Sequence, residues 1–122
     1  MSQRVIHFEI PAVDPELVAG FYRSAFGWKI EKWSGPQPYW LVQTGESGPG
    51  IDGGIMVRRD PFTNVTNTVS VENLDASMDY VLSLGGKLVG DKNTISGVGY
   101  SAYARDPEGN LFQMLQADKA AT

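Results

Sequence analysis

DPELVAGFYRSAFG, residues 14–27, and NLDASMDYVLSLGG, residues 73–86, are two copies of an internal repeat. Written one above the other, they align Phe21 with Tyr80 and place a glycine at the end of each copy. The offset between the copies is 59 residues (73 minus 14). An internal repeat indicates that one supersecondary unit occurs twice, so the surrounding sequence should also follow this offset.

Both copies are predicted to be helices that pack on a sheet. Asp14, with Pro15 at the first helical position, and Asn73 are N-cap residues, whose side-chain oxygens accept hydrogen bonds from unpaired backbone N–H groups. Apolar residues follow each cap at helical spacing. They are Leu17, Val18, Phe21, Tyr22 and Ala25 in the first copy, and Leu74, Met78, Val81 and Leu82 in the second.

Segments typical of strands precede and follow each helix. They are Val5–Pro11, Trp28–Trp33, Tyr39–Gln43 and Gly54–Arg58 around the first, and Asn67–Val71, Lys87–Gly90, Tyr100–Arg105 and Leu111–Gln116 around the second. Each half therefore reads strand, helix, three strands. The sequence predicts an α+β fold in a single domain, residues 1–122, with module one at about 4–59, a linker at about 60–66, module two at about 67–117 and a short C-terminal tail.

Composition excludes several classes of function. A chain of 122 residues with 42% hydrophobic content is long enough to bury a core of its own. It contains no cysteine, which excludes disulfides and thiolate metal sites. A net charge of -4 argues against a nucleic-acid partner, because phosphate binding requires a basic surface. No apolar run approaches the roughly 18 residues that span a membrane, so we expect a cytoplasmic protein with no membrane partner.

Three short motifs carry a family resemblance: IHFEI at residues 6–10, FYRSAFGW at 21–28 and DPEGNLFQMLQ at 106–116. In this order, with paired βαβββ modules, they resemble the vicinal oxygen chelate superfamily, which includes glyoxalase, bleomycin resistance proteins and extradiol dioxygenases. The resemblance covers the chain from about Val5 to Gln116. It implies a cupped sheet with the helices outside and the ligand inside, and a homodimer. Fold alone does not fix the function.

The resemblance also implies where a metal would bind, because members that use one hold it with side chains on the first and last strands of each module. His7 and Gln113 match two of these positions. The repeat offset gives Thr66 as the counterpart of His7, and Gly54, or Met56 after a two-residue slip, as the counterpart of Gln113. A divalent ion needs about three competent donors, and only the imidazole is a good one. We expect a degraded metal site and no cofactor.

His7 is the only histidine, and Glu9 lies on the same face of its predicted strand because side chains alternate. Three interpretations remain open. In the first, His7 and Glu9 form a metal-free acid/base or ligand-contacting pair, since a carboxyl group in a partly apolar cup is a candidate general base. Alternatively, His7 holds a metal. In the third, both are structural, with Glu9 tied to Thr68 or water and His7 to a backbone carbonyl.

Other side chains are expected to line the cup. The strands of module one carry Trp28, Trp33, Tyr39 and Trp40, only some of which can point inward, and Trp28 and Trp40 are as readily explained by packing or a dimer contact. The predicted catalytic pair is Glu9 and His7. The predicted ligand-binding residues are His7, Glu9, Trp40, Thr66, Thr68 and Gln113.

The favoured hypothesis is a glyoxalase- or bleomycin-resistance-like protein that binds a small, partly apolar molecule in the cup. The alternative is a metal-dependent lyase or isomerase of the glyoxalase type that uses His7 and Gln113, with or without Glu9. A third hypothesis is a dimeric interaction domain whose cup is filled by its own side chains. The glycine-rich segment at residues 44–53 is either a connector or a lid.

Overall fold

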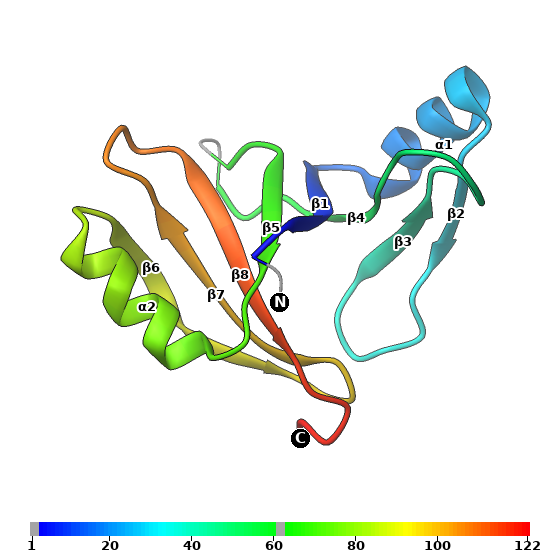
Figure 1. The fold of residues 1–122 in the computed structure, drawn as a ribbon. Helices are drawn as coiled ribbons and strands as arrows, with labels where there is room; N and C mark the ends of the chain where they lie inside the picture. The colour runs from blue at the N-terminus through cyan, green and yellow to red at the C-terminus, as the bar shows by residue number, and fades with distance from the viewer. Residues whose placement is uncertain (1–2, 61–62) are drawn as a thin grey trace. The chain divides into compact units, whose positions relative to one another are not determined.

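The computed structural model describes residues 3–60 and 63–122. The chain divides into two compact units, and each contributes one helix and a set of strands (Figure 1). Along the chain the elements follow the order strand, helix, three strands, twice over. The predicted α+β class and tandem βαβββ order are therefore confirmed. The predicted linker includes Pro61 and Phe62, which lie outside the described residues.

The first unit, His7–Val65, has the strand order β2-β3-β4-β1. β1 and β4 are parallel, and the other neighbouring strands are antiparallel. The helix α1 contacts β4 and β2. The elements are β1 Val5–Ala12, whose first two residues belong to the other unit, α1 Pro15–Phe26, β2 Lys29–Lys32, β3 Tyr39–Gln43 and β4 Asp52–Val57.

The second unit contains Thr66–Thr122 and the start of the chain up to Ile6, and its strand order is β5-β8-β7-β6. β5 and β8 are parallel, as β1 and β4 are in the first unit. The helix α2 contacts β6, β7 and β8. The elements are β5 Thr66–Ser70, α2 Leu74–Ser83, β6 Lys87–Ile95, β7 Gly99–Arg105 and β8 Leu111–Ala117.

The two helices begin at the predicted caps. The Leu17 N–H donates to Asp14 Oδ1 at 3.1 Å, and the Ala76 N–H donates to Asn73 Oδ1 at 2.9 Å. Gly27 ends α1 with a φ of 71°, a left-handed conformation that glycine adopts without strain. Within residues 3–60 and 63–122, neither helix is long and apolar enough to cross a membrane.

Two strands have a bound that differs from the predicted one by two residues or more. β6 was expected to end at Gly90 but continues to Ile95, because the polar residues beyond Gly90 pair with β7 after a bulge at which Gly90 has a φ of 74°. β4 begins at Asp52, two residues before the predicted start. Gly53 lies within this strand and pairs with Phe8. A Cβ there would lie 2.4 Å from the Phe8 carbonyl oxygen, so only glycine fits.

Each unit has its own hydrophobic core between its helix and one face of its strands. The first is built from Ala12, Ala19, Ile30, Trp40, Val42 and Ile55. The second is built from Val71, Leu74, Ala102, Ala104 and Met114. Because side chains alternate along a strand, the residues between these core positions lie on the opposite face, away from the helix. Most of the predicted site residues are among them.

Candidate functional site

The strand register shows which positions of the two units correspond. Glu9 pairs with Gly54 across β1 and β4, and Thr68 pairs with Gln113 across β5 and β8. Each residue of the second pair follows its counterpart in the first pair by 59 residues (68 minus 9, and 113 minus 54). Residues related by the repeat offset are therefore paired in the same way in the two units. Gly54 is therefore the counterpart of Gln113. The alternative, Met56, is two residues further along β4 and pairs with Pro11.

In the first unit, His7, Glu9 and Tyr39 form one hydrogen-bonded network. The Tyr39 hydroxyl lies 2.7 Å from His7 Nε2 and donates to Glu9 Oε2 at 3.1 Å. The His7 and Tyr39 rings stack, with centroids 6.3 Å apart and an interplanar angle of 14°. Glu9 is 7% exposed, so its carboxylate depends on such partners to offset the cost of burial. We call these three residues the His7–Tyr39–Glu9 network.

Gly54 makes room for this network. A Cβ added at Gly54 would lie 2.0 Å from the Tyr39 hydroxyl oxygen and 2.1 Å from its Cζ, far inside van der Waals contact. Gly54 is buried within β4, where β3 and β1 pair with it on either side. The Tyr39 phenol therefore occupies the space that any side chain at position 54 would need.

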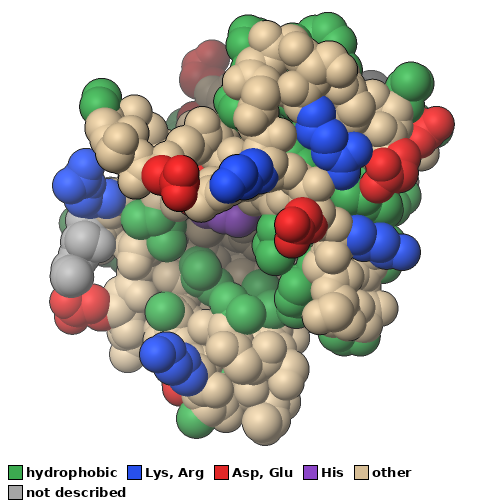
Figure 2. Space-filling model, turned by 90° about the vertical axis from the view of Figure 1, so that its right-hand side faces the viewer, with side chains coloured by type: hydrophobic (Ala, Val, Ile, Leu, Met, Phe, Trp, Pro, Cys, Tyr) green, Lys and Arg blue, Asp and Glu red, His purple; other side chains and the backbone are tan. Residues whose placement is uncertain are grey.

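The surroundings of His7 determine its charge and tautomer. Burial lowers the pKa of His7 below its ordinary value, and the nearby carboxylates of Glu9 and Asp52 only partly oppose this shift, so the ring is neutral near pH 7. A neutral imidazole has one N–H. Because the Tyr39 hydroxyl hydrogen goes to Glu9, we infer that Nε2 carries the imidazole hydrogen and donates it to the Tyr39 oxygen. In Figure 2 the purple histidine is set back from the surface.

In the second unit, Thr68 and Gln113 form a buried pair. Thr68 Oγ1 donates to Gln113 Oε1 at 2.7 Å, and the two residues are 1% and 7% exposed. The structural interpretation expected Glu9 to be tied to Thr68 or to water. In the structure the Thr68 hydroxyl hydrogen goes to Gln113, and Tyr39 donates to Glu9. Thr66, two residues earlier on β5, is also buried, at 3% exposed.

Trp40 lies on the opposite face of the sheet from the network. It belongs to the core beneath α1, and its indole Nε1 donates to Glu16 Oε2 at 2.5 Å, which lowers the pKa of Glu16. Trp40 therefore does not belong to the face that carries the network. Tyr39 is the residue that sequence reasoning left undecided. Tyr39 directly precedes Trp40, so the two side chains point to opposite faces of the sheet. Knowing the orientation of either ring would therefore have given the orientation of the other.

Of the four positions that the resemblance assigns to a metal, only His7 offers a good donor, and the neighbouring Glu9 carboxylate is engaged with Tyr39. His7 Nε2 is engaged with Tyr39, Gly54 offers no side chain, and a threonine hydroxyl such as that of Thr66 is a poor ligand. The Gln113 amide oxygen already accepts the Thr68 hydrogen. A divalent ion prefers at least three good donors, usually including an anionic one.

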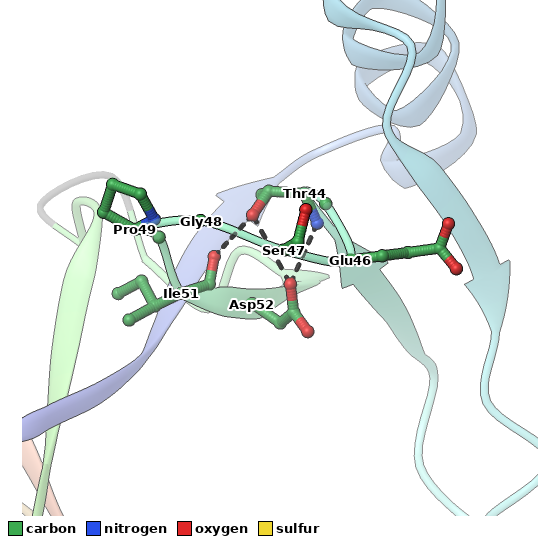
Figure 3. A pocket seen from close by; sticks show the side chains of 9 residues that line it. Thr44, Glu46, Ser47, Gly48, Pro49, Ile51 and Asp52 are labelled. Atoms are coloured by element: carbon green, nitrogen blue, oxygen red, sulfur yellow. Dashed lines mark hydrogen bonds between the residues drawn. The ribbon is translucent and has the colours of Figure 1, made fainter.

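The loop between β3 and β4 is hydrogen-bonded across its base (Figure 3). Asp52 Oδ1 accepts from the Thr44 backbone N–H at 2.9 Å, and Thr44 Oγ1 donates to the Ile51 carbonyl at 2.7 Å. The loop encloses a hollow of about 220 Å³ lined by its own residues, 44–52. These bonds hold the ends of the loop together, as a turn between neighbouring antiparallel strands requires.

Comparison with known proteins agrees with this architecture. Residues 6–115 match the glyoxalase-like domain family. A glyoxylase-like domain-containing protein of Didymella fabae is 34% identical over 88 residues, which make up 68% of this chain and 69% of that protein.

Solved structures resemble the chain over nearly its whole length. Methylmalonyl-CoA epimerase of Mycobacterium tuberculosis has a TM-score of 0.71 at 15% identity, covering 96% of this chain and 89% of the epimerase. A hypothetical protein of Bacillus halodurans C-125 has a TM-score of 0.72 at 12% identity, covering 98% and 97%. Streptomyces coelicolor methylmalonyl-CoA epimerase in complex with 2-nitronate-propionyl-CoA has 0.71 at 12%, covering 100% and 99%. At these identities the likeness concerns the fold alone.

Proposed function

Because the chain belongs to the glyoxalase-like domain family, and so to the vicinal oxygen chelate superfamily as its motifs indicate, we propose that it binds a small, partly apolar molecule without a divalent metal. One observation carries the proposal. The Tyr39 hydroxyl, hydrogen-bonded to His7 and Glu9, occupies the space above Gly54. The Tyr39 phenol thus takes the space that a metal-ligating side chain at position 54 would need.

The energetics of the network support metal-free binding. A metal ion at His7 Nε2 would require the lone pair there, so the inferred N–H would have to move and its bond to Tyr39 would be lost. The Gln113 oxygen, which accepts from Thr68, is a neutral and weak metal ligand. Breaking a buried hydrogen bond costs about 1 to 3 kcal/mol when a partner is left unsatisfied. The loss of the bond between His7 and Tyr39 would therefore offset part of the gain from binding a metal ion at His7.

The proposed ligand contacts come from the sheet faces that lie away from the helices. We propose that His7 and Glu9, with Tyr39 added and Trp40 omitted, supply the polar contacts of the first unit. Thr66, Thr68 and Gln113 are the proposed polar contacts of the second unit, taken by itself. Apolar side chains lie close to Tyr39 in the register: Met56 pairs with Tyr39, and Leu41, which is 48% exposed, pairs with Gly54. Such a surface suits a ligand with an apolar body and a few polar groups.

Elemental analysis of protein purified without chelator tests the proposal, together with dialysis against Zn²⁺, Ni²⁺ and Mn²⁺ followed by desalting. We expect substoichiometric metal in both preparations and the same metal content in a His7→Ala variant. One equivalent of metal that disappears in His7→Ala would overturn the proposal. That result would instead support the metal-dependent lyase or isomerase that uses His7 and Gln113.

A further inference from the structure

The helix α1 presents an apolar face to solvent. Leu17 and Phe21 are 71% and 62% exposed, although both side chains are large and apolar. Together with Gly20 and Ser24 they follow the spacing i, i+3, i+4, i+7, which places all four on one side of a helix. The other side of α1, which carries the buried Ala19, packs on the core. We call Leu17, Gly20, Phe21 and Ser24 the outer stripe of α1, and none of these four residues is charged.

The internal repeat shows that the fold does not require this composition. The corresponding positions of α2, 59 residues later, hold Ala76, Asp79, Tyr80 and Ser83. An exposed aspartate thus stands in α2 where α1 has Gly20, as is usual on a helix face in water. Glycine is unfavourable inside a helix, and among the described residues a Cβ at Gly20 would meet no atom within 4 Å. Packing within the chain therefore does not explain this glycine.

The outer stripe of α1 is complementary to itself when two copies of the helix cross antiparallel. A two-fold interface brings residue i of one copy to residue j of the other, and j to i. Leu17 and Phe21 are centred within one residue of Gly20, so Leu17 of each copy would lie against Phe21 of the other. Gly20 would then lie at the crossing point, where a missing side chain lets two backbones approach closely.

The charges beside the stripe fit the same arrangement. Glu16 in the first turn and Arg23 in the last turn form an ion pair along one flank of α1, with an N–O distance of 3.4 Å and exposed side chains. This pair is also centred within one residue of Gly20, so the antiparallel crossing brings Arg23 of each copy beside Glu16 of the other. It also brings the positive end of each helix dipole near the negative end of the other.

The Phe21 ring is already held in place for such a contact. It lies edge-on against Tyr22 with the centroids 5.1 Å apart, and the Tyr22 ring stacks on Trp28 at 4.8 Å. An aromatic side chain that is ordered before association loses little conformational freedom when it binds.

We propose that the outer stripe of α1 is the interface through which the chain binds a second copy of itself, with the two α1 helices antiparallel and Gly20 at their crossing. The interface is independent of the proposed ligand site, because α1 covers the face of the sheet opposite to the His7–Tyr39–Glu9 network. Two helices about 18 Å long make a small contact beside the roughly 1,200 Å² of a stable interface, so the dimer should be weak and reversible.

Sedimentation equilibrium over a range of protein concentrations tests the dimer. We expect a mass of 13.3 kDa at about 10 µM that rises toward twice this value at about 1 mM. Leu17→Asp puts a charge into the apolar contact and should weaken the dimer at least about tenfold. Ala76→Asp is the matched control, because it adds the same charge at the corresponding exposed position of α2. It should leave the dimer unchanged.

Cysteine cross-linking tests the orientation, since the chain contains no cysteine of its own. With copper–phenanthroline and air as the oxidant, Gly20→Cys should form a disulfide-linked dimer. In an antiparallel crossing at Gly20, the two Ser24 positions are eight residues, about 12 Å, apart along the helix axes. Ser24→Cys should therefore stay monomeric, because a disulfide joins Cα atoms no more than about 7 Å apart. Asp79→Cys, the counterpart of Gly20→Cys in α2, should also stay monomeric.

A mass that stays at 13.3 kDa at the highest concentration would overturn the inference and leave the proposed ligand binding standing. A dimer that Leu17→Asp and Ala76→Asp weaken equally would also overturn it. Cross-linking of Ser24→Cys as efficient as that of Gly20→Cys would contradict the antiparallel crossing. Circular dichroism spectra that match the wild type establish that each variant is folded.

Discussion

One methyl group at Gly54 should dismantle the His7–Tyr39–Glu9 network. The added Cβ of Gly54→Ala would lie 2.0 Å from the Tyr39 oxygen and 2.1 Å from Cζ, whereas non-bonded carbon atoms settle at about 3.5 to 4.0 Å. The backbone at Gly54 is held by pairing with Leu41 on one side and Glu9 on the other. The side chain of Tyr39 must therefore swing away, and its hydroxyl leaves both partners.

The cost follows from the two hydrogen bonds that are lost. The bond between His7 and Tyr39 joins neutral groups and is worth about 1 kcal/mol, and the bond to the Glu9 carboxylate is worth about 1.5 to 3 kcal/mol. Gly54→Ala should therefore lower the free energy of unfolding by about 2.5 to 4 kcal/mol. Gly45→Ala is the matched control, since a Cβ there meets no atom within 4 Å. Its effect should stay within about 0.5 kcal/mol.

A double-mutant cycle of Gly54→Ala and Tyr39→Ala, followed by urea unfolding, tests whether the clash with Tyr39 causes this loss of stability. In a Tyr39→Ala background the obstacle is gone, so adding Gly54→Ala should cost less than about 0.5 kcal/mol, which gives a coupling of about 2 kcal/mol or more. The reasoning is refuted if Gly54→Ala is as mild as Gly45→Ala. It is also refuted if the Gly54→Ala and Tyr39→Ala effects simply add.

Three further predictions concern single residues. The folded pKa of His7 is lowered by burial, so the unfolded chain takes up a proton first as the pH falls. Stability should therefore fall as the pH drops below about 6.5 toward the folded pKa. In urea titrations at several pH values, His7→Gln should flatten this dependence. The same pH dependence of stability in His7→Gln and in the wild type would contradict the prediction. Asn73→Ala removes the cap on the Ala76 N–H and should cost about 1 kcal/mol in urea unfolding, whereas Asn73→Asp should cost little, and equal losses would count against the cap. Thr68→Val leaves the Gln113 oxygen buried without its donor and should cost about 1 to 3 kcal/mol by thermal unfolding; an unchanged midpoint would show that this bond contributes nothing.

The fold could be predicted because its signals are local. Asp14 and Asn73 each cap a helix through a backbone N–H three residues away, and sequence spacing alone reveals such an arrangement. The repeat offset also predicted the counterpart of Gln113 as Gly54, or Met56 after a slip, and the strand register decides for Gly54. Alternation then placed His7 and Glu9 on one face of β1, where Tyr39 joins them.

The partner of His7 and Glu9 could not be predicted, because it depends on pairing between distant strands. Tyr39 reaches them only through the register of β3 against β4, which sets its ring over Gly54. Four aromatic residues were candidates for the cup, and their order in the sequence did not fix their orientation. The informative signal was the glycine within a buried strand, which marks a close approach by another group.

Native mass spectrometry of protein purified without chelator tests the central claim most directly, namely that this site binds a small molecule through Tyr39, His7 and Glu9 without a metal. We predict a bound organic molecule that is released on denaturation, is lost or replaced in Tyr39→Phe and Glu9→Gln, and persists in Glu46→Gln. A chain that carries one divalent ion, which His7→Ala removes, would contradict the account.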